Sequence, residues 1–213
     1  MQAQSLSVAD KYNEVFEYMR NAKESRFVDK DIFRILDKLS IPSKYKLKQQ
    51  VPSVGSRWLV VQGKDKQFID YMSFIKVKRS QEGVLQALML YKAKDMHKVA
   101  PGKIIFSKED VMQNVDAWFC VKEKWDYNED DNADCCIMLK EEYDELQQFE
   151  IQSPQVQFLD ENRAEVSYYY WNTINELVLE LVEVTFDKNR HVKIEEVGNV
   201  KFFDFSCVFN VCY

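Results

Sequence analysis

Apolar and polar residues alternate along the last third of the chain, residues 156–213, in segments separated by short polar turns. β-Branched and aromatic residues dominate these segments, which is typical of strands that are joined by short connections. Strands are predicted at residues 166–171, 177–186, 191–197 and 200–212. Because strands on short connections pair most easily with their sequence neighbours, the pattern predicts an antiparallel meander.

One segment of this region fits two structures. In residues 173–182, Thr173 and Glu176 can cap a helix whose apolar residues recur at helical spacing. As a strand, the segment loses its alternation near Leu181, which requires a bulge or burial on both faces. We favour the strand, because Val and Thr become frequent towards its end and residues 187–190 suit a hairpin turn. The helix stays open as the alternative.

The terminal segment is expected to lie inside the sheet. One side of the last predicted strand is an unbroken apolar row, formed by Phe203, Phe205, Cys207, Phe209, Val211 and Tyr213. Apolar residues also interrupt its other side, so we expect a central or covered strand rather than an exposed edge. Removal of residues 208–213 is therefore expected to abolish folding.

Helical spacing marks the start of the chain. A first amphipathic helix is predicted over residues 8–22, after Ser7, and a second over residues 30–39, with Asp29 as its N-cap. Pro42 disfavours helix at the residue before it and ends this unit. Two amphipathic helices need a surface to pack on, and the sheet is the obvious one.

The middle of the chain mixes strand and helix signals. Strands are predicted at residues 57–62, 68–79 and 84–94; a helix from the Ser107 cap to residue 115; a hairpin of residues 117–125 and 135–139; and a helix over residues 140–148.

These elements predict an α+β fold. Two N-terminal amphipathic helices are expected to pack on a curved, mostly antiparallel β-sheet of about seven to ten strands. Such a sheet could close into a cone or a barrel. We find no repeat and no sharp change of composition in the sequence. A single domain over residues 1–213 is therefore expected, with a helical lead-in at 1–40 and a mostly antiparallel sheet with short helices at 56–213.

Composition bears on the cellular compartment. The 213 residues contain no apolar run near the roughly 20 residues of a membrane-spanning helix, and the first seven residues do not form a signal peptide. The five cysteines are odd in number, and no two are spaced like the ligands of a zinc motif. We therefore expect reduced thiols and a cytoplasmic location.

The net charge of −6 conceals a segregation of charge along the chain. Residues 41–110 carry 14 Lys or Arg against 6 Asp or Glu, whereas residues 111–196 carry 7 against 21. Such asymmetry indicates either a surface for a charged partner or strands whose charges neutralise one another across a sheet. A basic run in the middle of the chain could follow a nucleic-acid backbone and comprises Lys44, Lys46, Lys48, Arg57, Lys64 and Lys66. The sequence pI of about 5.1 disfavours a dedicated nucleic-acid binder.

No motif for catalysis, metal or cofactor stands out. Residues 126–134 have the oxygen spacing of a calcium loop, but Asp131 and Ile137 replace its glycine and its bidentate glutamate, which favours a solvated loop tip. His97 and His191 lie in no catalytic motif, and the glycines form no phosphate-binding loop. We predict no catalytic residue, no metal site and no cofactor.

A run of aromatic residues is the strongest binding signal. On a strand, Tyr168 and Tyr170 would share one face, and Tyr169 and Trp171 the other. Exposed, these rings could bind a ligand or a partner, and the alternative is that both faces are buried. With the segregated charge, they favour a non-catalytic protein-interaction or assembly protein with a protein partner. The alternative is a small-molecule-binding or hydrolytic pocket enclosed by the curved sheet.

Overall fold

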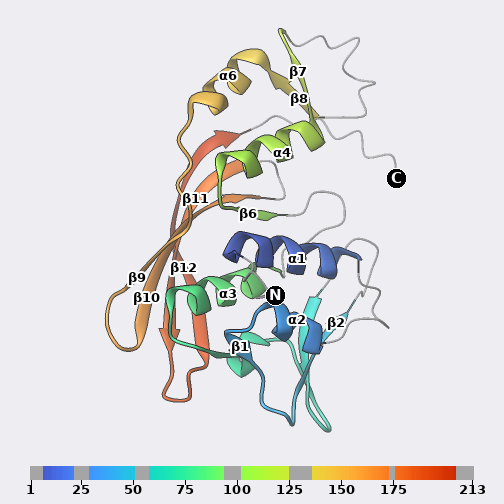
Figure 1. Cartoon of the computed structure of the whole chain (residues 1–213), viewed down its shortest axis with the longest axis vertical. Helices are drawn as coiled ribbons and strands as arrows, with labels where there is room; N and C mark the ends of the chain where they lie inside the picture. Colours follow the sequence, from blue (N-terminus) through green and yellow to red (C-terminus); the bar gives the residue numbers. More distant parts are fainter. Residues whose placement is uncertain are drawn as a thin grey trace, which may run out of the picture.

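Within the described residues, the last third of the chain forms an antiparallel meander, as its alternation predicts, but the strands predicted at 191–197 and 200–212 are wrong as separate elements, because residues 192–204 form one continuous strand through Gly198. In this computed structural model, the strands that pair in sequence order are β9 (Gln155–Phe158), β10 (Arg163–Trp171), β11 (Glu176–Phe186) and β12 (Val192–Asp204) (Figure 1). A fifth strand, β6 (Lys103–Ile105), pairs with β10 beyond the end of β9. The structure describes residues 7–21, 29–50, 58–93, 102–124, 136–172 and 176–204.

The ambiguous segment is strand within its described part, from Glu176 onward. Its partner β12 carries the irregularities: Val197 and Phe202 are skipped in the register between the two strands. Bulges of this kind let a strand change which face its side chains point to. Leu177 and Val178, adjacent in β11, are both buried on opposite faces of the sheet. Of the two alternatives predicted for a strand here, a bulge or burial on both faces, β11 therefore shows burial on both faces, and the bulges lie in β12.

Two apolar cores lie on the two faces of this sheet. The first core joins the N-terminal half of the chain to one face of β10 and contains Tyr12, Leu36, Leu88, Val166 and Tyr168 among its buried members. The second core lies on the other face and contains Val111, Met138, Leu146, Tyr169 and Trp171. Because successive side chains of β10 point to opposite faces of the sheet, this one strand contributes residues to both cores.

Five helices lie within the described residues: α1 (Val8–Asn21), α2 (Asp29–Ile35), α3 (Gln81–Lys92), α4 (Lys108–Trp118) and α6 (Lys140–Gln148). At the start of α1 the Ser7 hydroxyl accepts a hydrogen bond from the Asp10 amide (3.1 Å) and the Asp10 carboxylate accepts one from the Ser7 amide (3.1 Å). The predicted first helix and its cap are thus present. The mixed α+β class is confirmed, while packing of both N-terminal helices on a curved sheet stays a prediction.

The second predicted helix ends earlier than expected. Asp29 is the first residue of α2 rather than its N-cap, and the chain has become strand by β1 (Leu39–Ser40). β1 pairs antiparallel with β5 (Lys76–Val77), so Leu39 belongs to a ladder and not to a helix. A long-range pairing therefore overrides the helical spacing of this segment.

The predicted strand at residues 84–94 is wrong, because α3 occupies most of it. The Ser80 hydroxyl caps this helix by accepting a hydrogen bond from the Gly83 amide (3.0 Å). Nearly every residue from Gly83 to Leu90 is buried, so α3 lacks the polar face that distinguishes a surface helix from a buried strand in a sequence.

The predicted strand at residues 68–79 is also wrong as a continuous element. Here the chain forms β4 (Gln67–Phe68), the 3₁₀ helix η2 (Met72–Phe74) and β5. The strand predicted at 57–62 is confirmed as β3 (Trp58–Gln62), and it pairs with β2 (Lys46–Gln50), which the sequence pattern did not predict.

The hairpin predicted around the acidic loop is wrong. Strands β7 (Phe119–Lys122) and β8 (Cys136–Leu139) pair parallel, so their connection is not a hairpin. The candidate calcium loop, residues 126–134, lies outside the described residues. On either side, α4 has the predicted Ser107 capping box and extends beyond residue 115, and α6 matches the predicted helix at 140–148.

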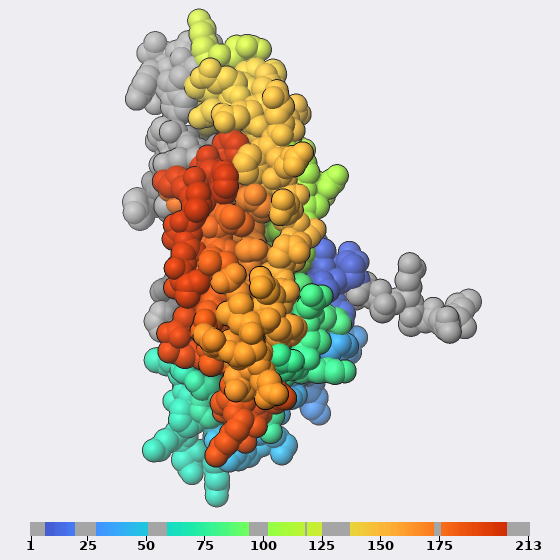
Figure 2. All heavy atoms as spheres, turned by 90° about the vertical axis from the view of Figure 1, so that its left-hand side faces the viewer, coloured from blue at the N-terminus to red at the C-terminus, as the bar shows by residue number. Residues whose placement is uncertain are grey.

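The prediction of one sheet of about seven to ten strands is wrong, because the described strands divide among four sheets, of which the largest has five strands. This main sheet is open within the described residues, and no closed barrel forms there. Among the described strands β12 pairs with β11 alone and ends the strand order, so the prediction of a central or covered last strand is wrong for the part up to Asp204. This strand exposes Val197 (56%), Val200 (55%) and Phe202 (41%). Figure 2 shows the main sheet from one side, where β9 to β12, in orange and red, run along the length of the molecule. The segment that holds β3 to β5, in turquoise, lies at the lower end of the molecule in this view. The prediction for residues 205–213 lies outside the described residues.

Cys120 is disulfide-bonded, so the prediction of reduced thiols is wrong for this residue. Its partner is not among the described side chains. None of the helices in the described ranges is long and apolar enough to cross a membrane. The cytoplasmic location and the single domain stay predictions.

Candidate functional site

The four predicted binding residues are buried in this structure. Tyr168 and Tyr170 lie in the first core and are 1% and 3% exposed. Tyr169 and Trp171 lie in the second core, where the Tyr169 ring meets Phe149 at 87° and 5.7 Å between centroids. The run is thus brought into two packed cores, and no ring presents a free face for stacking. Its role in binding stays a prediction.

A buried cluster of charges surrounds the Tyr168 side of this strand. The Lys92 side chain, at the end of α3, is 3% exposed, and its Nζ lies 2.6 Å from a carboxylate oxygen of Glu180 and 3.0 Å from one of Glu196. The Tyr168 hydroxyl donates a hydrogen bond to Glu180, and the Lys92 Nζ lies 4.4 Å from the centroid of the Tyr170 ring. The cluster joins α3 to β10, β11 and β12.

The protonation of this cluster disfavours a catalytic role. Burial by itself would lower the pKa of Lys92, but the charge and hydrogen bonds of Glu180 and Glu196 outweigh it and raise that pKa. Burial and the nearby charge of Glu180 raise the pKa of Tyr168 far above its usual value. Both groups therefore hold their protons at neutral pH, and neither is poised as a base or nucleophile. Their arrangement suits a clamp between α3 and the sheet.

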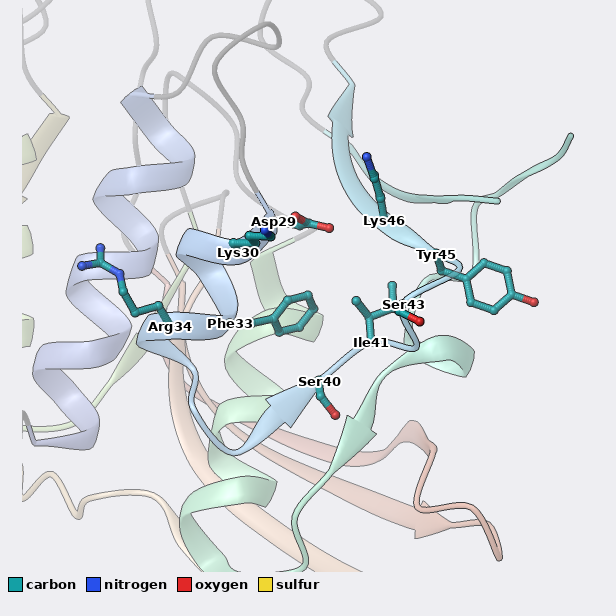
Figure 3. A pocket seen from close by; sticks show the side chains of 9 residues that line it. All are labelled: Asp29, Lys30, Phe33, Arg34, Ser40, Ile41, Ser43, Tyr45 and Lys46. Atoms are coloured by element: carbon teal, nitrogen blue, oxygen red, sulfur yellow. The ribbon is translucent and has the colours of Figure 1, made fainter. Parts of the chain in front are cut away.

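An open cleft between α2 and β2 is the candidate binding site (Figure 3). It has a volume of about 540 Å³. The residues that line it are Asp29, Lys30, Phe33, Arg34, Ser40, Ile41, Ser43, Tyr45 and Lys46. Phe33 points from α2 towards Ile41 and forms an apolar floor, and Lys46 extends along β2 on the opposite wall (Figure 3).

Local folding explains why this cleft has an apolar floor and a charged rim. In α2, Ile32 and Ile35 are buried in the first core, which leaves Phe33 half-buried between them. Along β2, Leu47 and Gln49 are buried, while Lys46 and Lys48 are exposed. The period of two in a strand therefore places both lysines on one side.

The rim of the cleft has an excess of positive charge. The residues that line the cleft include three cations, Lys30, Arg34 and Lys46, and one carboxylate, Asp29. None of these four forms an ion pair with another described residue. The Arg34 side chain extends away from Phe33, so Lys30 and Lys46 are the cations that flank the floor (Figure 3).

The same charge continues over the small sheet of β2, β3 and β4. Its exposed lysines without an ion pair to a described residue are Lys44, Lys46, Lys48, Lys64 and Lys66. Lys44 lies over the ring of Tyr45, with its Nζ 5.1 Å from the centroid. We call these five residues the lysine surface. Asp65 is the only acidic residue of the sequence between Ile41 and Phe68, so the lysine surface has little to neutralise it locally.

The excess of positive charge at this cleft suits binding of a negatively charged group. No three His, Cys, Asp or Glu side chains within the described ranges cluster in a way that could hold a metal ion. His191, one of two histidines, has its Nδ1 3.1 Å from Asp187 in a surface turn and lines neither described cavity. The second described cavity, of about 310 Å³, lies between η2 and β12 and has one Lys and one Asp in its lining.

The sequence indicated only part of this site. It singled out the basic run of Lys44, Lys46, Lys48, Arg57, Lys64 and Lys66, of which Arg57 lies outside the described residues. It did not indicate the contributions of Lys30 and Phe33 from α2. The alternation of Lys46 to Gln49 was a strand signal, but glutamine and lysine weaken it and β2 was missed.

Comparison with known proteins gives no relative. No protein-family model matches this chain, and neither a curated protein nor a solved structure matches it.

Proposed function

We propose that this protein is a non-catalytic interaction protein that binds an acidic segment of a protein partner at the α2–β2 cleft. The observation that carries the proposal is the lysine surface: five exposed lysines without a described counter-charge, beside an apolar floor of Phe33 and Ile41.

Two physical effects support an acidic protein segment as the ligand. Concentrated positive charge repels itself, and an acidic partner relieves that repulsion while it speeds association. The floor adds an apolar anchor, which supplies affinity that exposed ion pairs do not. A segment with carboxylates around an apolar side chain therefore uses both features of the cleft.

A small anionic molecule is the second candidate, because of the size of the cleft. Its volume of about 540 Å³ lies within the range of roughly 300–1,000 Å³ of small-molecule sites. The cleft is open, and its charge continues over the lysine surface beyond its rim. A peptide segment is long enough to contact both the cleft and the lysine surface beyond its rim, whereas a small molecule contacts the cleft alone.

A charge-reversal experiment tests the proposal. Two fluorescent acidic peptides serve as probes: a seven-residue peptide of alternating Glu and Val, and a stapled helical peptide of matched charge. The variant Lys46→Glu/Lys48→Glu should lose at least about tenfold in affinity for whichever peptide binds, and a rise from 50 to 300 mM salt should weaken wild-type binding.

The matched control is Lys78→Glu/Lys188→Glu, which changes the net charge equally at two exposed lysines outside the cleft. It should retain most of the affinity. Equal losses in both variants, or no binding of either peptide to the wild type, would contradict the proposal. Binding of inorganic phosphate or a small dicarboxylate at the cleft, without binding of either peptide, would favour the small-molecule alternative.

A further inference from the structure

β2 is an edge strand at the side of the cleft. The small sheet has the order β2–β3–β4, and β2 pairs with β3 alone within the described residues. Figure 3 shows β2 opposite α2, with the cleft between them. An edge strand has one row of backbone N–H and C=O groups that its own sheet does not use.

The outward backbone groups of β2 have no described backbone partner. Apart from its ladder with β3, no backbone hydrogen bond joins residues 46–50 to another described residue. α2 lies beside this edge as a helix, and a helix has no free ladder of groups to offer. The edge can therefore still accept a strand.

The side chains of β2 add a charge pattern to this edge. Lys46 and Lys48 are exposed on one side and two residues apart. In an added strand, alternate residues would lie opposite these two lysines, and opposite charges directly across a ladder attract. A strand with acidic residues at every second position therefore complements β2 in both backbone and charge.

From this pattern we infer that the cleft binds its acidic partner segment as an extended strand added to the outer edge of β2. Carboxylates at alternate positions lie opposite Lys46 and Lys48, and Phe33 and Ile41 contact an apolar residue that points into the cleft. This inference rests on the proposed function and specifies the conformation and the residue spacing of the partner segment.

The inference is tested with backbone methylation of the alternating Glu and Val peptide. In a strand that is added to an edge, only every second amide N–H points towards that edge. Two peptides are compared with the parent, one N-methylated at odd positions and one at even positions. Methylation removes the donors, and so it blocks binding only in the set that faces β2.

The expected result is a clear asymmetry between the two methylated peptides. One should lose about tenfold or more in affinity, because its two or three hydrogen bonds to the five residues of β2 are removed, and the other should bind within about threefold of the parent. The affinity of the parent should also exceed that of the helical peptide of matched charge.

Other outcomes separate this inference from the proposed function. Equal affinities of the two methylated peptides, or tighter binding of the helical peptide, would overturn strand addition but leave an acidic partner at the cleft. If neither unmethylated peptide binds in a manner that depends on Lys46 and Lys48, the inference and the proposed function fail together.

Discussion

The lysine that α3 buries against the main sheet and two lysines of the small sheet are in opposite situations. Lys92 is 3% exposed and lies within 3.0 Å of two carboxylates. Lys46 and Lys48 are exposed and have no described ion pair. Lys92 therefore joins α3 to the main sheet, whereas Lys46 and Lys48 make no ion pair within the described structure.

The basic segment of the sequence, residues 41–110, therefore contains cations that are paired with carboxylates of the acidic segment and cations without an ion pair to a described residue. Where the basic segment reaches the main sheet, Lys92 is neutralised locally, because it pairs with Glu180 and Glu196. The lysines of the small sheet lie apart from those carboxylates and keep their charge. Neutralisation therefore accounts for one part of the pattern, and the other part motivates the proposed partner.

The largest expected effect is loss of the buried lysine. Lys92→Met should lower the free energy of unfolding by about 3–5 kcal/mol, because Glu180 is left charged and buried without its cation. Urea denaturation measures this change. Adding Glu180→Gln to Lys92→Met should restore part of the loss.

Lys48→Met is the matched control for this change and should shift the free energy of unfolding by no more than about 0.5 kcal/mol, as is usual for an exposed side chain. Losses of similar size in the two variants would remove the distinction between structural and available lysines.

A smaller effect is expected where the buried aromatic strand meets a glycine. A Cβ at Gly102 would lie 2.0 Å from the Tyr170 hydroxyl oxygen, whereas a Cβ at Gly198 on the edge strand would meet no atom within 4 Å. Gly102→Ala should therefore destabilise by about 1–3 kcal/mol through overpacking, and Gly198→Ala by no more than about 0.5 kcal/mol. Thermal unfolding of both variants checks this difference, and a larger loss for Gly198→Ala would be inconsistent with the packing described.

A pH-dependent effect, the smallest, is expected at the polar cluster that joins α1 to α3. Lys11 lies 2.6 Å from Asp37 and 2.7 Å from Glu82. Partial burial opposes ionisation of Asp37, but hydrogen bonds from Lys11, Lys38 and Gln86 outweigh it and lower the pKa of Asp37 below its usual value. Stability from a lowered pKa is present above the unfolded value of about 4 and is lost as the pH falls through the folded value.

Asp37→Asn should therefore lower the melting temperature at pH 7, and the difference from wild type should shrink as the pH falls below about 4. The readout is a series of thermal melts between pH 7 and pH 2.5. A difference that stays constant over this range would show that the Asp37 charge does not contribute.

The sequence predicted well those elements whose pattern is set locally. The meander and α1 follow from alternation and helical spacing, and the Ser107 cap of α4 from a pair of residues three apart. It failed where tertiary burial removes the pattern, as in α3, whose apolar surroundings leave no polar face to detect. It also failed for the parallel pairing of β7 with β8, because strand direction depends on the connection and not on the residues that pair.

The candidate site shows the same division. The excess of lysine between Ile41 and Phe68 is visible in composition, and it became the lysine surface. The apolar floor depends on Phe33 of α2 meeting Ile41, which is a contact between two elements and leaves no local signal. Conversely, the run from Tyr168 to Trp171 was the strongest local signal for binding, and both of its faces are filled by packing.

Binding of the partner segment at β2 is tested by the backbone amide chemical shifts of isotope-labelled protein during titration with the alternating Glu and Val peptide. Shift changes should concentrate in β2 and α2, around Lys46, Lys48 and Phe33, and none should occur in β10 or β11. Shift changes that concentrate around Tyr169 and Trp171, or that are absent from β2 while the peptide is bound, would contradict binding at β2.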